Sequence, residues 1–127
     1  MNHGTLNKLI DSFEFAKQGI YYAFKTQNSF RIQILCAILS IILAIFFRFN
    51  RFEWMILIFT ICAVLSAELL NTVIETIVDL YTNEFHQKAK LAKDLSAGVV
   101  LLTCMFAVAI GLILFIPHFI TVFGLSA

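Results

Sequence analysis

The sequence predicts an all-α integral membrane protein, with one amphipathic helix at the membrane surface and three helices that cross the membrane. Of the 127 residues, 61% are hydrophobic and only 13% are charged, about half the charged share of a typical soluble domain. A water-soluble fold of this length could not bury so much apolar surface. We therefore expect residues 1–127 to form a single domain whose main solvent is the lipid bilayer.

Residues 6–24 predict an amphipathic helix lying in the membrane interface. Apolar residues recur there at helical spacing, while most charged residues fall off that stripe, namely Lys8, Asp11, Glu14 and Lys17. An ordinary helix packed on the water side of the membrane spans is the alternative that this pattern allows. Because charges interrupt the segment, we do not expect it to be a cleaved signal peptide.

The first membrane span is expected at about residues 31–48. This stretch is almost wholly apolar between Arg31 and Arg48, whose long side chains can reach the polar interface from either end. A short polar break precedes it, in which Asn28 or Ser29 is a suitable cap for the start of the helix.

The second and third spans are expected at about residues 54–80 and 95–116. The second begins at Trp54, a residue type that anchors helices at the interface. We expect Pro117 and His118 to end the third span, because proline interrupts helical hydrogen bonding.

The positively charged residues predict how the chain lies in the membrane. Seven lysines and arginines fall before the first span or between the second and third: Lys8, Lys17, Lys25, Arg31, Lys88, Lys90 and Lys93. Only Arg48 and Arg51 fall on the other side. Basic residues gather in the cytosol, so we expect the N-terminus and the connection between spans two and three to be cytosolic.

Two classes of function have no support in the sequence. A net charge of +1 gives no reason to expect a nucleic-acid partner. The three cysteines, Cys36, Cys62 and Cys104, lie far apart inside apolar stretches and do not have the spacing of metal ligands. We interpret them as small packing residues.

A row of acidic and amide residues lies in the second half of the second span. Glu68, Asn71, Glu75 and Asp79 are spaced by three, four and four residues, which stacks them on one face of a helix. Each acidic residue inside a membrane costs about 2.5–3.5 kcal/mol. A helix end in water would explain Asp79, but it explains Glu68 poorly because the flanking residues are apolar. The row therefore predicts a functional site.

A second polar cluster follows, containing Glu84, His86, Lys93 and Asp94. Lysines can bind phosphate groups as point charges, although basic loops beside a membrane often serve only as topology signals or contact anionic lipids. Together the two clusters suggest carboxylates that hold Mg²⁺ or accept a proton, and lysines that neutralise phosphoryl charge. No P-loop or protein-kinase signature accompanies them.

The acidic row also carries a resemblance to a known family. The segment Glu68-Leu-Leu-Asn71-Thr-Val-Ile-Glu75-Thr-Ile-Val-Asp79 resembles the signature of the prokaryotic diacylglycerol kinase and undecaprenol kinase family. The likeness continues through residues 84–98 and reaches back to Phe30-Arg31 and the N-terminal helix. It covers roughly residues 9–116, and a twelve-residue acidic and amide pattern inside a membrane span is a specific signal.

The resemblance implies both an assembly and a reaction. It implies a homotrimer with active sites between protomers, in the cytoplasmic membrane of a bacterium. It implies phosphorylation of a membrane lipid alcohol, with ATP as co-substrate and Mg²⁺ as cofactor. Glu68 then corresponds to the general base, and Glu75 to the ligand of the divalent metal carried with ATP. The other expected contacts to the nucleotide or the site are Asn71, Asp79, Glu84, His86, Lys93 and Asp94.

Two positions depart from the family pattern. Gln27 stands where members often have a second acidic metal ligand, so the expected metal site has one charge fewer. Phe15 stands where some members have a tyrosine that contacts the nucleotide. Neither change affects Glu68 or Glu75, but the first puts the number of bound metal ions in question.

The identity of the lipid and the class of function have alternatives. Residues 13–16, 22–26 and 30–32 look more like the Gram-positive undecaprenol kinase branch, which favours undecaprenol as the acceptor over diacylglycerol. Acidic residues inside a membrane also occur in small transporters and proton relays. A structural or regulatory membrane subunit is a third possibility, in which Glu75 and Asp79 would be dispensable.

Overall fold

The structure, a computed structural model, describes residues 3–81, 84 and 86–124 as four α-helices joined by short connections. They are α1 (His3–Thr26), α2 (Asn28–Phe46), α3 (Arg51–Tyr81) and α4 (Gln87–Val122). The described residues contain no β-strand. The all-α fold class predicted from the sequence is therefore confirmed.

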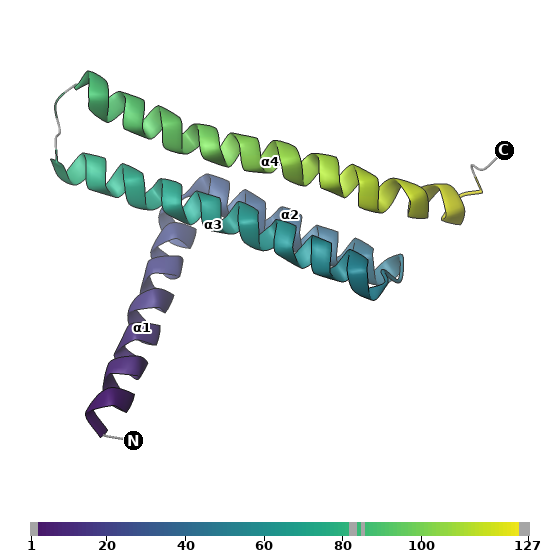
Figure 1. The fold of residues 1–127 in the computed structure, drawn as a ribbon, viewed down its shortest axis with the longest axis horizontal. Helices are drawn as coiled ribbons and strands as arrows, with labels where there is room; N and C mark the ends of the chain where they lie inside the picture. The colour runs from purple at the N-terminus through teal and green to yellow at the C-terminus, as the bar shows by residue number, and fades with distance from the viewer. Residues whose placement is uncertain (1–2, 82–83, 85, 125–127) are drawn as a thin grey trace.

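Helices α2, α3 and α4 are each long and apolar enough to cross a membrane. They run alongside one another, with α3 packed against both α2 and α4, whereas α1 projects across the direction of this bundle (Figure 1). Most of the large apolar side chains face outward, including Phe59, Leu101 and Ile113. Such a surface suits lipid, and the crosswise α1 suits a helix that lies along the membrane surface.

The helix lengths show where the membrane boundary lies relative to the acidic row. Helix α2 has 19 residues and is about 28 Å long by helix rise, close to the roughly 30 Å hydrocarbon thickness of a bilayer. Helices α3 and α4 have 31 and 36 residues, so they extend beyond the apolar layer. Because α2 and α3 join through a short turn at one end, the excess length of α3 lies at the other end, beside Gln27.

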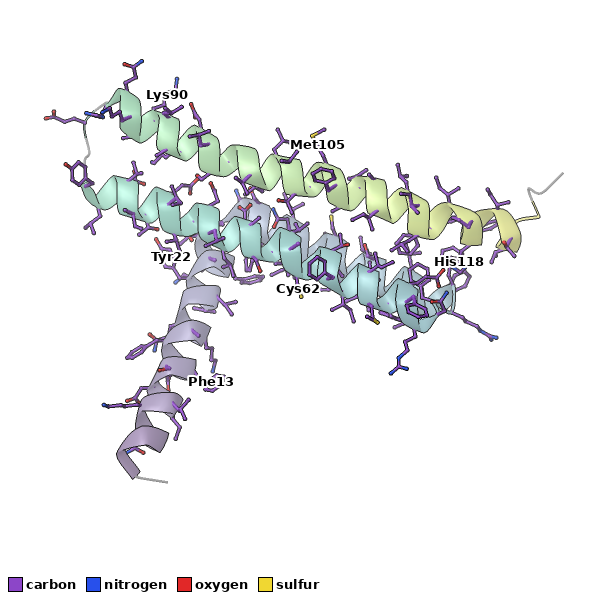
Figure 2. All side chains as sticks on the ribbon, in the orientation of Figure 1. Phe13, Tyr22, Cys62, Lys90, Met105 and His118 are labelled. Atoms are coloured by element: carbon purple, nitrogen blue, oxygen red, sulfur yellow. The ribbon has the colours of Figure 1, made fainter. Side chains whose placement is uncertain are left out.

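The best-buried apolar residues gather where α2 turns into α3. Ala44, Phe47, Phe49 and Leu57 pack there with Leu114 of α4. His118 of α4 stacks on Phe49, with ring centroids 5.0 Å apart. Figure 2 shows His118 at the opposite end of the bundle from Lys90. This apolar cluster holds the three membrane helices together at the end away from the acidic row.

A capping box begins α3, as the sequence Asn50-Arg-Phe-Glu53 allows. The Asn50 side-chain oxygen accepts hydrogen bonds from the backbone N–H groups of Phe52 and Glu53, at 2.9 and 3.1 Å. The Glu53 carboxylate accepts in return from the backbone N–H of Asn50, at 2.7 Å. Its second oxygen lies 2.9 Å from Nε2 of His118, so this cap also links α3 to α4.

Replacing Asn50 with alanine should destabilise the fold without touching the acidic row. The change removes the acceptor for two N–H groups at the start of α3, and loss of such a cap costs about 0.5–2 kcal/mol. We expect a lower midpoint of thermal unfolding in detergent. Asn50→Asp, which keeps the acceptor oxygen, is the control, and equal midpoints for Asn50→Ala and the unchanged protein would contradict the capping role.

Two sequence predictions about helix ends were wrong. The α2 cap is Gln27, which makes no side-chain capping hydrogen bond, and Asn28 and Ser29 already lie inside the helix. The chain needs only one extended residue to pass from α1 to α2. The polar stretch expected to contain Asn28 or Ser29 as a cap is therefore reduced to the single residue Gln27.

Pro117 does not end the third membrane helix. Helix α4 continues through Pro117 and His118 to Val122. A proline inside a membrane helix is tolerated where neighbouring groups compensate for the missing hydrogen bond. Here α4 is anchored past the proline because His118 contacts Glu53 of α3 and Phe49, which precedes α3. At its other end, α4 begins at Gln87, so Lys93 and Asp94 are helical residues rather than loop residues.

Candidate active site

Glu68 is the most deeply placed carboxylate of the acidic row. Only 3% of its surface is exposed. Its Oε2 accepts a hydrogen bond from Nε2 of Gln33 on α2, at 2.9 Å. Gln33 lies six residues after the α1–α2 junction at Gln27, or about 9 Å along α2 by helix rise. Among the described residues, Gln33 is the side chain that hydrogen-bonds to the Glu68 carboxylate, and the depth of Gln33 along α2 is that expected for the apolar layer.

Glu75 lies about 10 Å from Glu68 along α3 by helix rise, beside Gln27 at the α1–α2 junction. Asn71 donates from Nδ2 to its Oε1 at 3.1 Å, and Gln27 donates from Nε2 to its Oε2 at 3.3 Å. The Ser96 hydroxyl of α4 donates to Oδ1 of Asn71 at 2.7 Å. Residues of α3 and α4, together with Gln27 at the α1–α2 junction, thus fix the orientation of Glu75.

Asp79 lies at the water-facing end of the row. Nζ of Lys93 and Oδ1 of Asp79 are 2.5 Å apart, and the two side chains are 38% and 62% exposed, in that order. This ion pair joins the end of α3 to the first turns of α4. Because both side chains are solvated, the pair adds little stability, but it keeps a lysine beside the row.

The remaining candidates of the second cluster lie near the α3–α4 connection. Glu84 and His86 are exposed there, and Asp94 is exposed on α4. His86 precedes the first residue of α4 without capping it through its side chain. Within the described residues, neither His86 nor Asp94 makes a side-chain hydrogen bond to the acidic row. The structure thus gathers Glu68, Asn71, Glu75, Asp79 and Lys93, and leaves these three open to solvent.

The residues around Glu75 fit a magnesium ion that also binds phosphates. In the described part of the chain, no three histidine, cysteine or acidic residues are grouped so that they alone could hold a metal. Mg²⁺ commonly takes only one or two carboxylates and completes its shell with water and substrate phosphates. Glu75 would supply the carboxylate, and the amide of Gln27 could turn its oxygen toward the same place, while Asn71 remains the donor that orients Glu75.

Two site residues were not identified from the sequence. Gln33 lies in the stretch that the sequence describes as almost wholly apolar, although a lone amide inside a membrane span is a signal of the same kind as Glu68. Ser96 lies within the motif but was not singled out. Two residues were expected to depart from the family pattern. Phe15 is 68% exposed on α1, and Gln27, expected near the metal, contacts Glu75.

Comparison with known proteins identifies what the chain is similar to. The sequence model described as prokaryotic diacylglycerol kinase matches residues 14–115. An undecaprenol kinase of Bacillus subtilis is 38% identical over 116 residues, which cover 91% of this chain and 94% of that relative. A diacylglycerol kinase of Synechocystis is 40% identical over 110 residues, 86% of this chain and 63% of the relative. A diacylglycerol kinase of Escherichia coli is 27% identical over 118 residues, 93% of this chain and 97% of the relative.

Proposed function

This chain belongs to the prokaryotic diacylglycerol kinase family and is a lipid kinase, and from that premise we propose that it transfers the γ-phosphate of ATP to undecaprenol within the membrane. The relatives that match are named kinases, so the transporter and structural-subunit alternatives lose their support. The observation that carries the proposal is the buried Glu68 carboxylate, held by Gln33 inside the apolar layer. A carboxylate at that depth is reached by the hydroxyl of a membrane lipid.

Glu68 acts as the general base in this proposal. Among the described residues, hydrogen bonds reach its Oε2 but not its Oε1, so Oε1 is the oxygen that takes the hydroxyl proton of the lipid. The alcohol oxygen then forms a bond to the γ-phosphorus, and the bond from that phosphorus to the β–γ bridging oxygen breaks. ADP leaves with the electron pair of that bond, and the proton on Glu68 passes to water afterwards.

In this proposal the phosphates of ATP lie beside Glu75 and its neighbours. Mg²⁺, when bound, neutralises phosphate charge, and Glu75 is the residue that would hold it. Lys93, which pairs with Asp79, supplies a positive charge for the transferred phosphoryl group. Asn71 keeps Glu75 oriented through its 3.1 Å hydrogen bond.

The nucleotide-facing residues extend along the water-exposed end of the row. We propose that Asp79, Glu84, His86, Lys93 and Asp94 contact ATP there, together with Asn71 and Glu75. These residues lie on the side where helices α3 and α4 extend beyond the apolar layer. ATP then arrives from water and the lipid from the bilayer, and they meet between Glu68 and Glu75.

The proposal includes a topology and an assembly. The N-terminus and the α3–α4 connection face the cytosol, since seven of the nine lysines and arginines lie on that side. The chain assembles as a homotrimer in the bacterial cytoplasmic membrane, as expected from the family resemblance. The many outward-facing apolar side chains can pack against either lipid or another protomer.

Comparison of two of the matched relatives favours undecaprenol over diacylglycerol as the acceptor. The Bacillus undecaprenol kinase is matched over 94% of its length, and the Synechocystis diacylglycerol kinase over 63%. The latter is slightly more identical, at 40% against 38%. Diacylglycerol is therefore the second candidate acceptor.

A lipid panel tests the proposed acceptor. Purified protein is given ATP with a labelled γ-phosphate, Mg²⁺, and either undecaprenol or diacylglycerol in mixed micelles. We expect label to enter undecaprenol with a kcat/KM at least about tenfold above that for diacylglycerol, equivalent to about 1.4 kcal/mol. Faster labelling of diacylglycerol would reverse the assignment of substrate, and labelling of neither lipid would contradict the proposed function.

A further inference from the structure

A groove runs along the membrane helices from Gln33 toward the far end of the bundle. Its cavity has a volume of about 290 Å³ and is lined by residues of α2, α3 and α4. Gln33 lines it near Glu68, while Leu57, Leu114 and Phe115 line it near the apolar cluster at the opposite end. The groove therefore begins at the residue that hydrogen-bonds to the proposed base and extends along the apolar part of the helices.

The groove wall offers almost no polar group to an occupant. The hydroxyls of Ser40 and Thr60 already donate to backbone carbonyls of their own helices, each at 2.8 Å. Oε1 of Gln33 is different, because it is buried and has no hydrogen-bond partner within the described part of the chain. A buried acceptor left without a partner is unfavourable, so this oxygen favours an occupant that brings a hydrogen-bond donor.

These features specify the chemistry of the occupant. It must be apolar along most of its length and carry a hydrogen-bond donor at the end beside Gln33. A long-chain alcohol has both properties. We infer that the groove binds the hydrocarbon chain of the acceptor lipid, and that Gln33 accepts a hydrogen bond from the lipid hydroxyl; this inference rests on the proposed function.

Gln33 then binds both the base and the alcohol. Its Nε2 donates to Oε2 of Glu68, and its Oε1 accepts from the hydroxyl. Rotation of the hydroxyl about its C–O bond turns the same proton from Gln33 to Oε1 of Glu68, which removes it as the alcohol oxygen bonds to phosphorus. Gln33 itself gains and loses no proton, so its role is to place the alcohol and the carboxylate side by side.

Gly111 gives a way to block the groove far from the chemistry. It lines the groove on α4, and a Cβ atom added there would meet no atom within 4 Å. It lies 15 residues beyond Ser96, which is level with Asn71, or roughly 22 Å along α4 by helix rise. A side chain at this position occupies the path of the lipid chain without reaching Glu68.

The test compares Gly111→Phe with Ile113→Phe. Ile113 lies two residues further along the same helix, is 74% exposed and does not line the groove. For the lipid alcohol that the unchanged protein prefers, Gly111→Phe should raise KM about tenfold or more, within the range that misfit in an apolar pocket costs. Its KM for ATP and its apparent size in detergent should stay unchanged, and Ile113→Phe should change none of these values.

Gln33→Leu tests the other end of the groove. The leucine removes both hydrogen bonds of the amide at similar volume, so kcat for the lipid should fall about tenfold or more while KM for ATP stays the same. An unchanged lipid KM in Gly111→Phe, or an unchanged kcat in Gln33→Leu, would overturn the inference. So would an altered size of Gly111→Phe in detergent, since the groove would then be a contact between copies. If the unchanged protein phosphorylates no lipid alcohol, the proposed function itself fails.

Discussion

Replacing Glu68 with glutamine should lower kcat for lipid phosphorylation by about 10²–10⁴-fold, the usual contribution of a general base. Glutamine keeps the size of the side chain and an oxygen that can accept the hydrogen bond from Gln33. The fold should therefore be retained, and KM for ATP should change little, because Glu68 lies about 10 Å from Glu75 along α3. The measurement is transfer of labelled γ-phosphate at saturating ATP and lipid.

Glu53 supplies the matched control for Glu68. It lies on the same helix but at the opposite end of the bundle, where it pairs with His118. Glu53→Gln makes the same chemical change and should leave kcat within about twofold, although it weakens the contact between α3 and α4 and lowers thermal stability. A Glu68→Gln protein that is folded and fully active would show that Glu68 is not the base.

Replacing Glu75 with glutamine should have the second-largest effect. The carboxylate is the one negative group that receives hydrogen bonds from both Asn71 and Gln27 in the described structure, and the amide removes its charge. We expect the Mg²⁺ concentration for half-maximal activity to rise at least about tenfold, and kcat/KM for ATP to fall about 10²-fold or more, as when one electrostatic contact to a transferring group is removed.

A magnesium titration separates the role of Glu75 from that of Glu68. For Glu75→Gln, part of the lost rate should return as Mg²⁺ is raised, because weaker binding is offset by mass action. For Glu68→Gln, added Mg²⁺ should restore nothing, since the missing step is proton removal. If Glu75→Gln shows the same half-maximal Mg²⁺ concentration as the unchanged protein, Glu75 is not the metal ligand.

The acidic row shows how far the sequence could predict the site. The spacing of Glu68, Asn71 and Glu75 places them on one helical face whatever else the chain does, and the structure has all three on the inner side of α3. The sequence also marked Gln27 as unusual near the expected metal. It did not reveal that Gln27 would reach Glu75, because 48 residues separate the two.

Gln33 and Pro117 show where local patterns were insufficient. Gln33 is a single amide in an apolar stretch, and its importance depends on facing Glu68 across the α2–α3 contact. Pro117 predicts a helix end from backbone chemistry alone, yet α4 continues because His118 is fixed by Glu53 and the aromatic rings around it. In both places, contacts between helices outweighed the local signal.

The sequence by itself determined that the chain is a membrane protein, that its helices are long and apolar, and that one face of α3 carries carboxylates at fixed intervals. These properties follow from composition and from the 3.6-residue period of the helix. Only the tertiary structure decided which residues complete that face, because partners such as Gln33 and Ser96 are supplied by other helices. Helix packing set their positions and directions, and so, among the described residues, it left the Glu68 carboxylate bound to Gln33 and the Glu75 carboxylate bound to Asn71 and Gln27.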